Sequence, residues 1–319
     1  MIEARGLTKR YGKTLAVDSL SFDVRPGQVT GFLGPNGSGK STTMRLIMGL
    51  DLPNAGQAII NGRPYKNLPW PMHEVGALLE AKAIHPGRSA YNHLFMLAQT
   101  HGIRRKRVDE VLELVGLTDV AGRRAGKFSL GMGQRLGIAA ALLGDPSVLL
   151  FDEPVNGLDP EGILWVRTLL RHLAGEGRTV FVSSHLMSEM AITADHVVVI
   201  GRGHLIADQP VADLVAQSSG HFVKVRTPDT DRLSGLLTTA GGKVTASADG
   251  SIAVSELTAE AIGDLAAEHR VRLHELTPLR ASLEEAFMDL TRDSIEFHGG
   301  QAGAAPAAPE PATETEAAR

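Results

Sequence analysis

The loop "GPNGSGKS" at residues 34–41 restricts the fold of this chain more than any other stretch. It follows the apolar run "VTGF", precedes the helical pattern "TTMRLIMGL", and fits G-x-x-x-x-G-K-[ST]. Its glycines let successive backbone N–H groups turn inward toward phosphate oxygens. Lys40 brings a positive charge to the outer phosphates, and the Ser41 hydroxyl is placed to ligate Mg²⁺. The loop therefore predicts a nucleotide-binding site between a strand and a helix.

An acidic pair, Asp152 and Glu153, directly follows the apolar run "VLLF". A phosphoryl-transfer site needs an acidic residue at the end of a second buried strand, and Asp152 would hold the magnesium shell there. Glu153 would orient and deprotonate water, and a general base typically contributes about 10²–10⁴-fold to the rate. Such a pair is a weak signal alone, because many strands end in Asp or Glu. Beside the phosphate-binding loop it becomes a strong one.

His185 follows the apolar run "TVFVSS" and joins Lys40 and Glu153 as a predicted catalytic residue. A lone histidine is more often a hydrogen-bonded structural residue, as buried polar groups usually are. Here it stands one strand beyond the acidic pair, where a polar side chain would reach the terminal phosphate. This position favours the catalytic interpretation.

The stretch "FSLGMGQRLG" at residues 128–137 opens an apolar helical pattern with a serine and three glycines. One interpretation is a helix capped by Ser129 with loose glycines around it. The other is an anion-binding site, because a helix N-terminus presents free N–H groups and the positive end of the helix dipole. The stretch by itself does not choose between them.

The composition excludes several classes of protein. Cysteine is absent, which excludes disulfides, thiolate metal sites and thiol catalysis. The formal net charge of -4 indicates no bulk attraction to nucleic acid or anionic lipid, and we expect no nucleic-acid partner. The basic run "RRKR" at residues 104–107 is more simply a solvated helix start. No secretory signal is visible, and no window offers the ~18 continuous apolar residues that a membrane span needs.

Apolar strand patterns alternate with helical patterns along residues 1–217, which indicates an α/β domain around a mainly parallel sheet. Residues 81–144 are nearly all helical in pattern and read as a helical insertion into that domain. Short alternating strands and two helical segments in residues 218–292 predict a small α+β accessory domain without catalytic chemistry. Residues 293–319 are expected to form a disordered tail, because their last stretch, residues 299–319, carries no apolar side chain larger than alanine and is rich in Pro, Ala and Glu.

With these residues placed, residues 1–217 resemble the ATP-binding cassette (ABC) family of ATPases, whose motifs occur here in the family's order. Tyr11, in "KRYGKTLAV", matches the aromatic residue that stacks on adenine. The loop "GPNGSGKST" matches the P-loop, and "SLGMGQR" falls at the signature motif, about twenty residues before "VLLFDEP". "NGLDP" matches the D-loop, and "SSHLMSE" carries the switch histidine, His185.

The resemblance implies a P-loop NTPase fold with a mainly parallel sheet, an antiparallel β part and a helical subdomain, and it implies ATP and Mg²⁺ as cofactors. It also implies a head-to-tail homodimer, in which each ATP lies between one P-loop and the other chain's signature motif. Asp159 would communicate across that interface. Integral membrane permease subunits would dock on the helical subdomain, which puts the chain at the cytoplasmic face of the cell membrane.

The residues that the resemblance assigns fall into three groups. Those expected to contact ATP in the same chain are Tyr11, Gly34, Pro35, Asn36, Gly37, Ser38, Gly39, Lys40, Ser41, Thr42 and Glu80. Those expected to contact ATP bound to the partner are Ser129, Leu130, Gly131 and Met132. Those expected to hold the metal are Ser41, Asp152 and Glu80.

The sequence departs from the family pattern at two places. Glu80 stands where the family has a glutamine, and a carboxylate only accepts hydrogen bonds whereas an amide also donates. Leu130 and Met132 replace a glycine and a glutamine of the signature. With the closing stretch "SLEEAFMDLT", these departures are similar to one branch, the ATPases of ABC-2 type exporters that confer drug and bacitracin resistance.

The main functional hypothesis is therefore an ATPase subunit that drives export of a drug, peptide or lipid-like substrate through separate permease chains. The runner-up is a soluble ABC ATPase acting on nucleic acid or ribosomes. A single cassette and the lack of a long heptad segment argue against it. A third hypothesis is a regulatory subunit with poor turnover, which the intact Glu153 and His185 argue against. The sequence does not identify the transported substrate, because the residues that contact it would lie in the permease chains.

Overall fold

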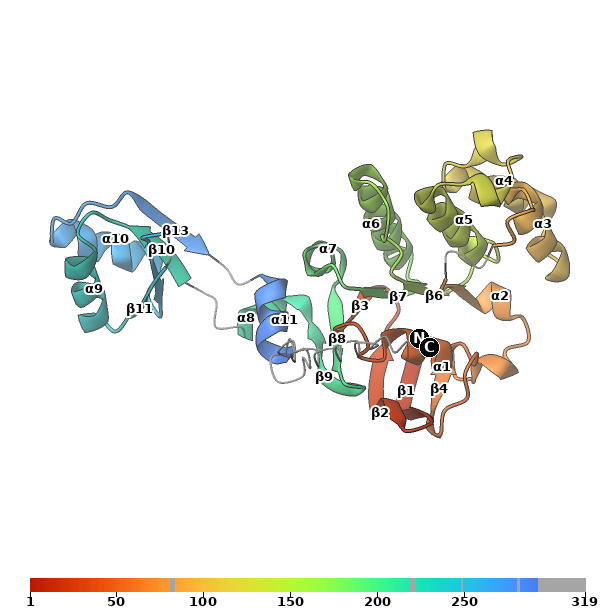
Figure 1. Cartoon of the computed structure of the whole chain (residues 1–319), viewed down its shortest axis with the longest axis horizontal. Coiled ribbons are helices and arrows are strands. Elements are labelled where there is room, and N and C mark those ends of the chain that lie inside the picture. The colour runs from red at the N-terminus through yellow and green to blue at the C-terminus, as the bar shows by residue number, and fades with distance from the viewer. Residues whose placement is uncertain (81–83, 218–221, 248, 280–281, 292–319) are drawn as a thin grey trace, which may run out of the picture.

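The computed structural model describes residues 1–80, 84–217, 222–247, 249–279 and 282–291, and its centre is a six-stranded sheet (Figure 1). The strands, in sheet order, are β5 (Val75–Leu78), β6 (Val148–Asp152), β7 (Thr179–Ser184), β3 (Val29–Leu33), β8 (His196–Gly201) and β9 (His204–Pro210). All pairings are parallel except that of β8 with β9. Every residue of β3 and β7 is buried, as expected for strands with covered faces.

A second, antiparallel sheet packs over one face of the first. Its strands, in order, are β2 (Thr14–Val24), β1 (Ile2–Tyr11) and β4 (Ala55–Ile60). Helix α1 (Lys40–Ile47) lies between the two sheets and contributes the buried Met44 and Ile47 to their shared core. The rings of Phe22, Phe32 and Phe181 meet there with centroids 5.0 to 5.6 Å apart. These aromatic contacts join β2 of the second sheet to β3 and β7 of the main sheet.

Helices cover the other face of the main sheet and extend beyond it (Figure 1). The helical segment expected near residues 81–144 contains α3 (Ala90–Thr100), α4 (Arg105–Leu114) and α5 (Leu130–Leu142). Their apolar stripes share one core, to which Leu94, Val111 and Leu136 contribute fully buried side chains. The remaining helices of this part are α2 (Pro71–Glu74), α6 (Pro160–Gly175), α7 (Met187–Thr193) and α8 (Val211–Gln217). Short 3₁₀ turns lie at Tyr65–Asn67, Thr118–Val120 and Ala125–Lys127.

The C-terminal part forms a small antiparallel sheet with its own core. Its strands, in sheet order, are β11 (Lys243–Ala246), β12 (Ile252–Ser255), β10 (Phe222–Arg226) and β13 (Glu275–Leu279). Helices α9 (Thr230–Thr239) and α10 (Ala259–Glu268) pack on it, and Val225, Leu237 and Ile262 are fully buried between them. The last helix, α11 (Leu283–Thr291), packs instead against α7 and α8.

This architecture confirms the predicted fold class: a mainly parallel sheet, an antiparallel β part, a helical segment and a small C-terminal α+β domain. The domain boundaries at residues 217 and 292 fall beside residues outside the described ranges and stay predictions. The tail expected at residues 293–319 also lies outside the described residues.

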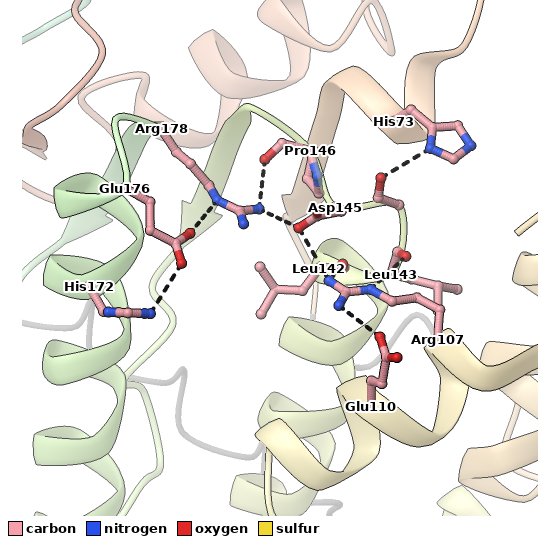
Figure 2. A network of polar contacts seen from close by, with 11 residues as sticks. His73, Arg107, Glu110, Leu142, Leu143, Asp145, Pro146, His172, Glu176 and Arg178 are labelled. Atoms are coloured by element: carbon pink, nitrogen blue, oxygen red, sulfur yellow. Dashed lines mark hydrogen bonds and ion pairs between the residues drawn. The ribbon is translucent and has the colours of Figure 1, made fainter. Parts of the chain in front are cut away.

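A network of charged contacts ties the helical segment to the main sheet where α5 ends and β6 begins (Figure 2). Asp145, in left-handed conformation with φ 54°, accepts from Arg107 of α4 at 3.4 Å and from Arg178 at 2.9 Å. Arg107 also donates to the carbonyls of Leu142 and Leu143 at 3.0 and 3.4 Å. The last carbonyls of a helix lack hydrogen-bond partners within it. Arg107 supplies such partners at the end of α5 and so joins α5 to α4.

Arg107→Ala should therefore lower the free energy of unfolding by about 1–2 kcal/mol, since it removes charge-assisted hydrogen bonds to partly buried carbonyls. Urea denaturation followed by circular dichroism measures the change. The control is Lys106→Ala, one residue earlier on α4, whose 87 % exposed side chain forms an ion pair with Glu110 on the surface of the same helix. An equal effect of the two substitutions would contradict a joining role for Arg107.

Candidate active site

The glycine-rich loop connects β3 to α1 and is closely packed against its neighbours. Gly39, the residue before α1, has φ 105°, and a Cβ there would lie 2.5 Å from the carbonyl oxygen of Ala16. A Cβ on Gly34 would lie 2.5 Å from the carbonyl oxygen of Ile200. These positions therefore exclude any side chain, and the loop leads directly into the N-terminus of α1, where the first N–H groups lack partners within the helix.

Lys40 is a buried cation with only 7 % of its surface exposed. Its Nζ donates to the carbonyl oxygens of Gly34 at 2.6 Å and Pro35 at 3.3 Å, within its own loop. Burial lowers its pKa below the ordinary lysine value, while the charges of Glu153 and Asp152 oppose that shift. No carboxylate pairs directly with Lys40 among the residues that the structure describes, so its charge remains available to an anion.

A pocket of about 380 Å³ opens beside this loop and brings most of the predicted same-chain residues together. The residues that line it are Ala16, Asn36, Gly37, Gly39, Lys40, Ser41, Thr42, Leu79, Asp152 and Glu153. Gly34, Pro35 and Ser38 belong to the same loop but are not among the residues that line the pocket. The loop and the acidic pair, far apart in the sequence, face one cavity because β3 and β6 flank β7 in a parallel sheet and end at the same edge.

Ser183, a fully buried residue of β7, links both members of the acidic pair. Its hydroxyl donates to the carboxylate of Asp152 and accepts the backbone N–H of Glu153 at 3.0 Å. A carboxylate that accepts such a hydrogen bond is held in one orientation. Ser183 was not among the residues predicted from the sequence. Its one signal was a serine following the apolar run "VFV" near the end of a strand pattern.

The side chains of Glu153 and His185 meet at the same edge. His185 follows β7, and its Nδ1 lies 2.7 Å from Oε2 of Glu153. Because a carboxylate only accepts, Nδ1 carries the proton of this hydrogen bond. Oε1 of Glu153 has no hydrogen-bond partner among the described residues. The Glu153 side chain is 23 % exposed and that of His185 46 %, so solvent reaches the pair.

The two predicted ATP contacts outside the glycine-rich loop do not line the pocket either. Tyr11, 46 % exposed, donates its hydroxyl to Asp51 at 2.8 Å, and the Lys9 ammonium lies 4.9 Å from its ring centroid. Glu80 is exposed, but it follows Leu79, which does line the pocket, at the edge where β5 pairs with β6. The contacts expected from Glu80 and Tyr11 stay predictions.

The residues predicted to act on a partner chain also lie away from this pocket. Ser129 is the N-cap of α5, and its hydroxyl accepts the N–H of Met132 at 3.2 Å. Asp159 is the N-cap of α6, where its carboxylate accepts the N–H of Gly162 at 2.9 Å. The capped-helix interpretation of the signature stretch is thus confirmed. It does not exclude the anion-binding interpretation, because Leu130 and Gly131 stand at a helix N-terminus facing outward with Leu130 50 % exposed.

The residues of the pocket fit a magnesium ion that is held together with a nucleotide. Within the described ranges, no three His, Asp or Glu side chains are arranged to hold a metal by themselves. Ser41 and Asp152 nevertheless line one pocket and offer a hydroxyl and a carboxylate. Mg²⁺ commonly takes one or two such oxygens and completes its shell with water and substrate phosphates. The oxygen donors therefore suit Mg²⁺, with Glu80 as the predicted third contributor.

Among the helices in the described part of the chain, none is both long and apolar enough to cross a membrane.

Two family models match the sequence. The model described as "ABC transporter" matches residues 17–156, which include the glycine-rich loop, the signature stretch and the acidic pair. A model described as "Domain of unknown function (DUF8746)" matches residues 221–284, which span the small C-terminal sheet.

Curated relatives and solved structures extend this likeness. YhcH of Bacillus subtilis (strain 168), an uncharacterized ABC transporter ATP-binding protein, is 36 % identical over 93 % of this chain and 97 % of its own length. The bacitracin transport ATP-binding protein BcrA of Bacillus licheniformis is 44 % identical over 66 % of this chain and 70 % of its own. The dimeric structure of MJ0796, a bacterial ABC transporter cassette, is 25 % identical with a TM-score of 0.61, covering 66 % of this chain and 98 % of that one.

Proposed function

The chain belongs to the ABC transporter family, whose ATP-binding subunits are ATPases, and we propose that it is the ATP-hydrolysing subunit of an exporter with separate membrane permease chains. The single observation that carries the catalytic part is the pocket in which Lys40 and Ser41 face Asp152 and Glu153. That pocket unites a phosphate-binding loop with the acidic pair that metal-assisted phosphoryl transfer requires.

In this proposal the P-loop, residues 34–42, holds the phosphates of ATP. Its backbone N–H groups and the buried ammonium of Lys40 contact the phosphate oxygens, which replace the loop carbonyls as partners of Nζ. Tyr11 stacks on adenine and lies near Thr42 at the start of α1, which supports the assignment. Ser41, Asp152 and Glu80 would hold Mg²⁺, which would supply positive charge beside the phosphates.

Hydrolysis then depends on Glu153 and His185. Oε1 of Glu153 accepts a proton from the attacking water, because Oε2 is occupied by the hydrogen bond from His185. The imidazole keeps that carboxylate in place, and its second nitrogen, Nε2, is free to contact the terminal phosphate. The short Glu153–His185 contact at the pocket edge supports this division of roles.

We also propose that the active species is a homodimer. The chain has one P-loop and one signature stretch, so a head-to-tail pair supplies both halves of each ATP site. Ser129, Leu130, Gly131 and Met132 of one copy then face the terminal phosphate bound by the other, with the hydroxyl of Ser129 and the N–H of Gly131 as contacts. Asp159 communicates across the interface. The dimeric form of the similar bacterial cassette supports this arrangement.

The partners of the dimer are integral membrane permeases that dock on the helical subdomain, which holds it at the cytoplasmic face of the membrane. The substrate class is a drug, peptide or lipid-like molecule, and BcrA, a relative named for bacitracin transport, supports it. The alternative, an ABC ATPase acting on nucleic acid or ribosomes, is less well supported. The net charge of -4 offers nothing to attract a polyanion.

Glu153→Gln and Glu80→Gln test the assigned roles side by side. Glu153→Gln should stall ATP hydrolysis and leave ATP binding intact, because the amide cannot accept the proton. Glu80→Gln keeps a metal-facing oxygen and should retain much of the ATPase rate. Steady-state phosphate release and equilibrium binding of a fluorescent ATP analogue measure the two properties. A loss in Glu80→Gln as complete as in Glu153→Gln would show that the role of Glu80 is wrong.

Ser129→Arg tests the composite site. The large cation at the N-terminus of α5 should abolish ATPase activity, while the separate subunit binds nucleotide as before, because its own P-loop is untouched. Mixing Ser129→Arg with an excess of the Lys40→Ala chain provides the control. One of the two sites in the mixed dimer then has an intact P-loop and an intact signature, so some turnover should return. Unchanged turnover in Ser129→Arg alone would show that the signature stretch serves only to cap α5.

Export is tested by co-expression with the neighbouring reading frame, which the proposal expects to encode a permease. The chain should co-purify with a six-span membrane protein from detergent extracts, and the complex should hydrolyse ATP faster than the isolated chain. Recovery of RNA or DNA in place of a membrane protein would favour the alternative function.

A further inference from the structure

Glu153 is held in an unusual backbone conformation. Its φ of 51° lies in the left-handed region, which non-glycine residues rarely adopt and which persists only where the surroundings hold it. The backbone conformation of Glu153 sets the direction of its side chain. It therefore determines whether Oε1 can reach a water molecule bound in the pocket. The groups that hold the Glu153 backbone therefore determine the position of the proposed general base.

Two buried side chains from different elements form hydrogen bonds with the backbone of Glu153. Ser183 of β7 accepts the N–H of Glu153 at 3.0 Å. Gln134 of α5 donates its side-chain Nε2 to the carbonyl of Glu153 at 3.2 Å and to that of Asn156 at 3.4 Å. Gln134 is 5 % exposed and Ser183 is fully buried, so water cannot readily take the place of either. The turn from Glu153 to Asn156 is thus bound on one side to the sheet and on the other to α5.

Gln134 is not explained by stability alone. Both hydrogens of its amide are used, but its Oε1 is buried without a partner among the described residues. Burying an unpaired acceptor is unfavourable, and an apolar side chain of similar size would avoid it. Two facing carbonyls can be satisfied only by a donor, which fixes the amide with its nitrogen toward the turn. The side chain is therefore placed for its donors.

We propose that Gln134 is a positioning residue for ATP hydrolysis, which couples the orientation of Glu153 to the position of helix α5. Ser129, the N-cap of the same helix, precedes Gln134 by five residues, or about 7.5 Å along the axis. A helix of this length moves as one body, so a shift at its signature end displaces the carbonyl of Glu153 through the amide of Gln134. This inference rests on the proposed function, in which the signature end contacts the partner's ATP.

The test uses the full chain with Gln134→Met, which keeps the length and volume and removes both donors. kcat for ATP should fall about tenfold to a hundredfold, since part of the contribution of a general base is lost, while KM stays within about twofold. The variant should also accumulate as an ATP-bound dimer on gel filtration, as Glu153→Gln should, because ATP binds and is not cleaved. Ile138→Val, a buried change on the same helix one turn further on, is the control for packing and should keep wild-type kcat.

Gln134→Glu provides a second variant of nearly identical shape. Its side chain donates one hydrogen bond to the facing carbonyls while protonated and repels them when ionised. The ratio of its kcat to that of the wild type should therefore fall as pH rises from about 5 to about 8, because facing carbonyls raise the pKa of a buried carboxyl. A purely structural role would lower the melting temperature and nucleotide affinity together and leave this ratio flat.

The outcomes separate two failures. If the wild type hydrolyses ATP and Gln134→Met matches it in kcat, the positioning role is overturned and the proposed function stands. If the wild type neither hydrolyses ATP nor dimerises with it, the proposed function itself fails. A loss of kcat in Ile138→Val as large as that in Gln134→Met would also overturn the role, since any disturbance of α5 would then suffice.

Discussion

The site depends on one geometric constraint, that parallel strands with covered faces can present polar groups only where they end. β3, β6 and β7 run side by side as buried, mainly apolar strands, and their charged residues come where the strands end, at the same edge of the sheet. Because the side chains along the strands are committed to packing, the chemistry concentrates at that edge. The order of strands in the sheet, with β7 between β3 and β6, then decides that Lys40 faces Asp152 and Glu153 across the width of a single strand.

The positive charge at this edge lacks a negatively charged partner within the described part of the chain, so an anion can bind there. A buried ammonium bonded to neutral carbonyls is incompletely compensated, and two carboxylates near it are directed elsewhere, Asp152 to Ser183 and Glu153 to His185. Pairing Lys40 directly with either carboxylate would neutralise it and close the site. The hydroxyl of Ser183 and the imidazole of His185 therefore do more than orient their partners. They also keep the two carboxylates from forming ion pairs with Lys40, so that its ammonium can bind a phosphate.

The sequence allowed the parts of this site that lie within one continuous stretch to be predicted. The glycine-rich loop, Asp152, Glu153 and His185 each follow an apolar strand pattern, and the structure brings the first three to one pocket with His185 bonded to Glu153. What could not be predicted depends on contacts between segments distant in sequence. One example is the left-handed backbone of Glu153. Another is the pair of salt bridges from Asp145 to Arg107 and Arg178, which form only when three separate segments of the chain come together. The signature stretch belongs to neither group, because its proposed partner is a second molecule.

The packing of α11 onto α7 and α8 has a topological consequence. Chain segments on both sides of the small C-terminal sheet belong to the larger core, to which Leu214 of α8 and Leu283 and Phe287 of α11 contribute buried side chains. The small domain is therefore an insert held at two ends rather than an appendage on a single tether. Cutting the chain after α8 does not simply remove a terminal module, because it also strips the apolar cover from the helix that follows His185.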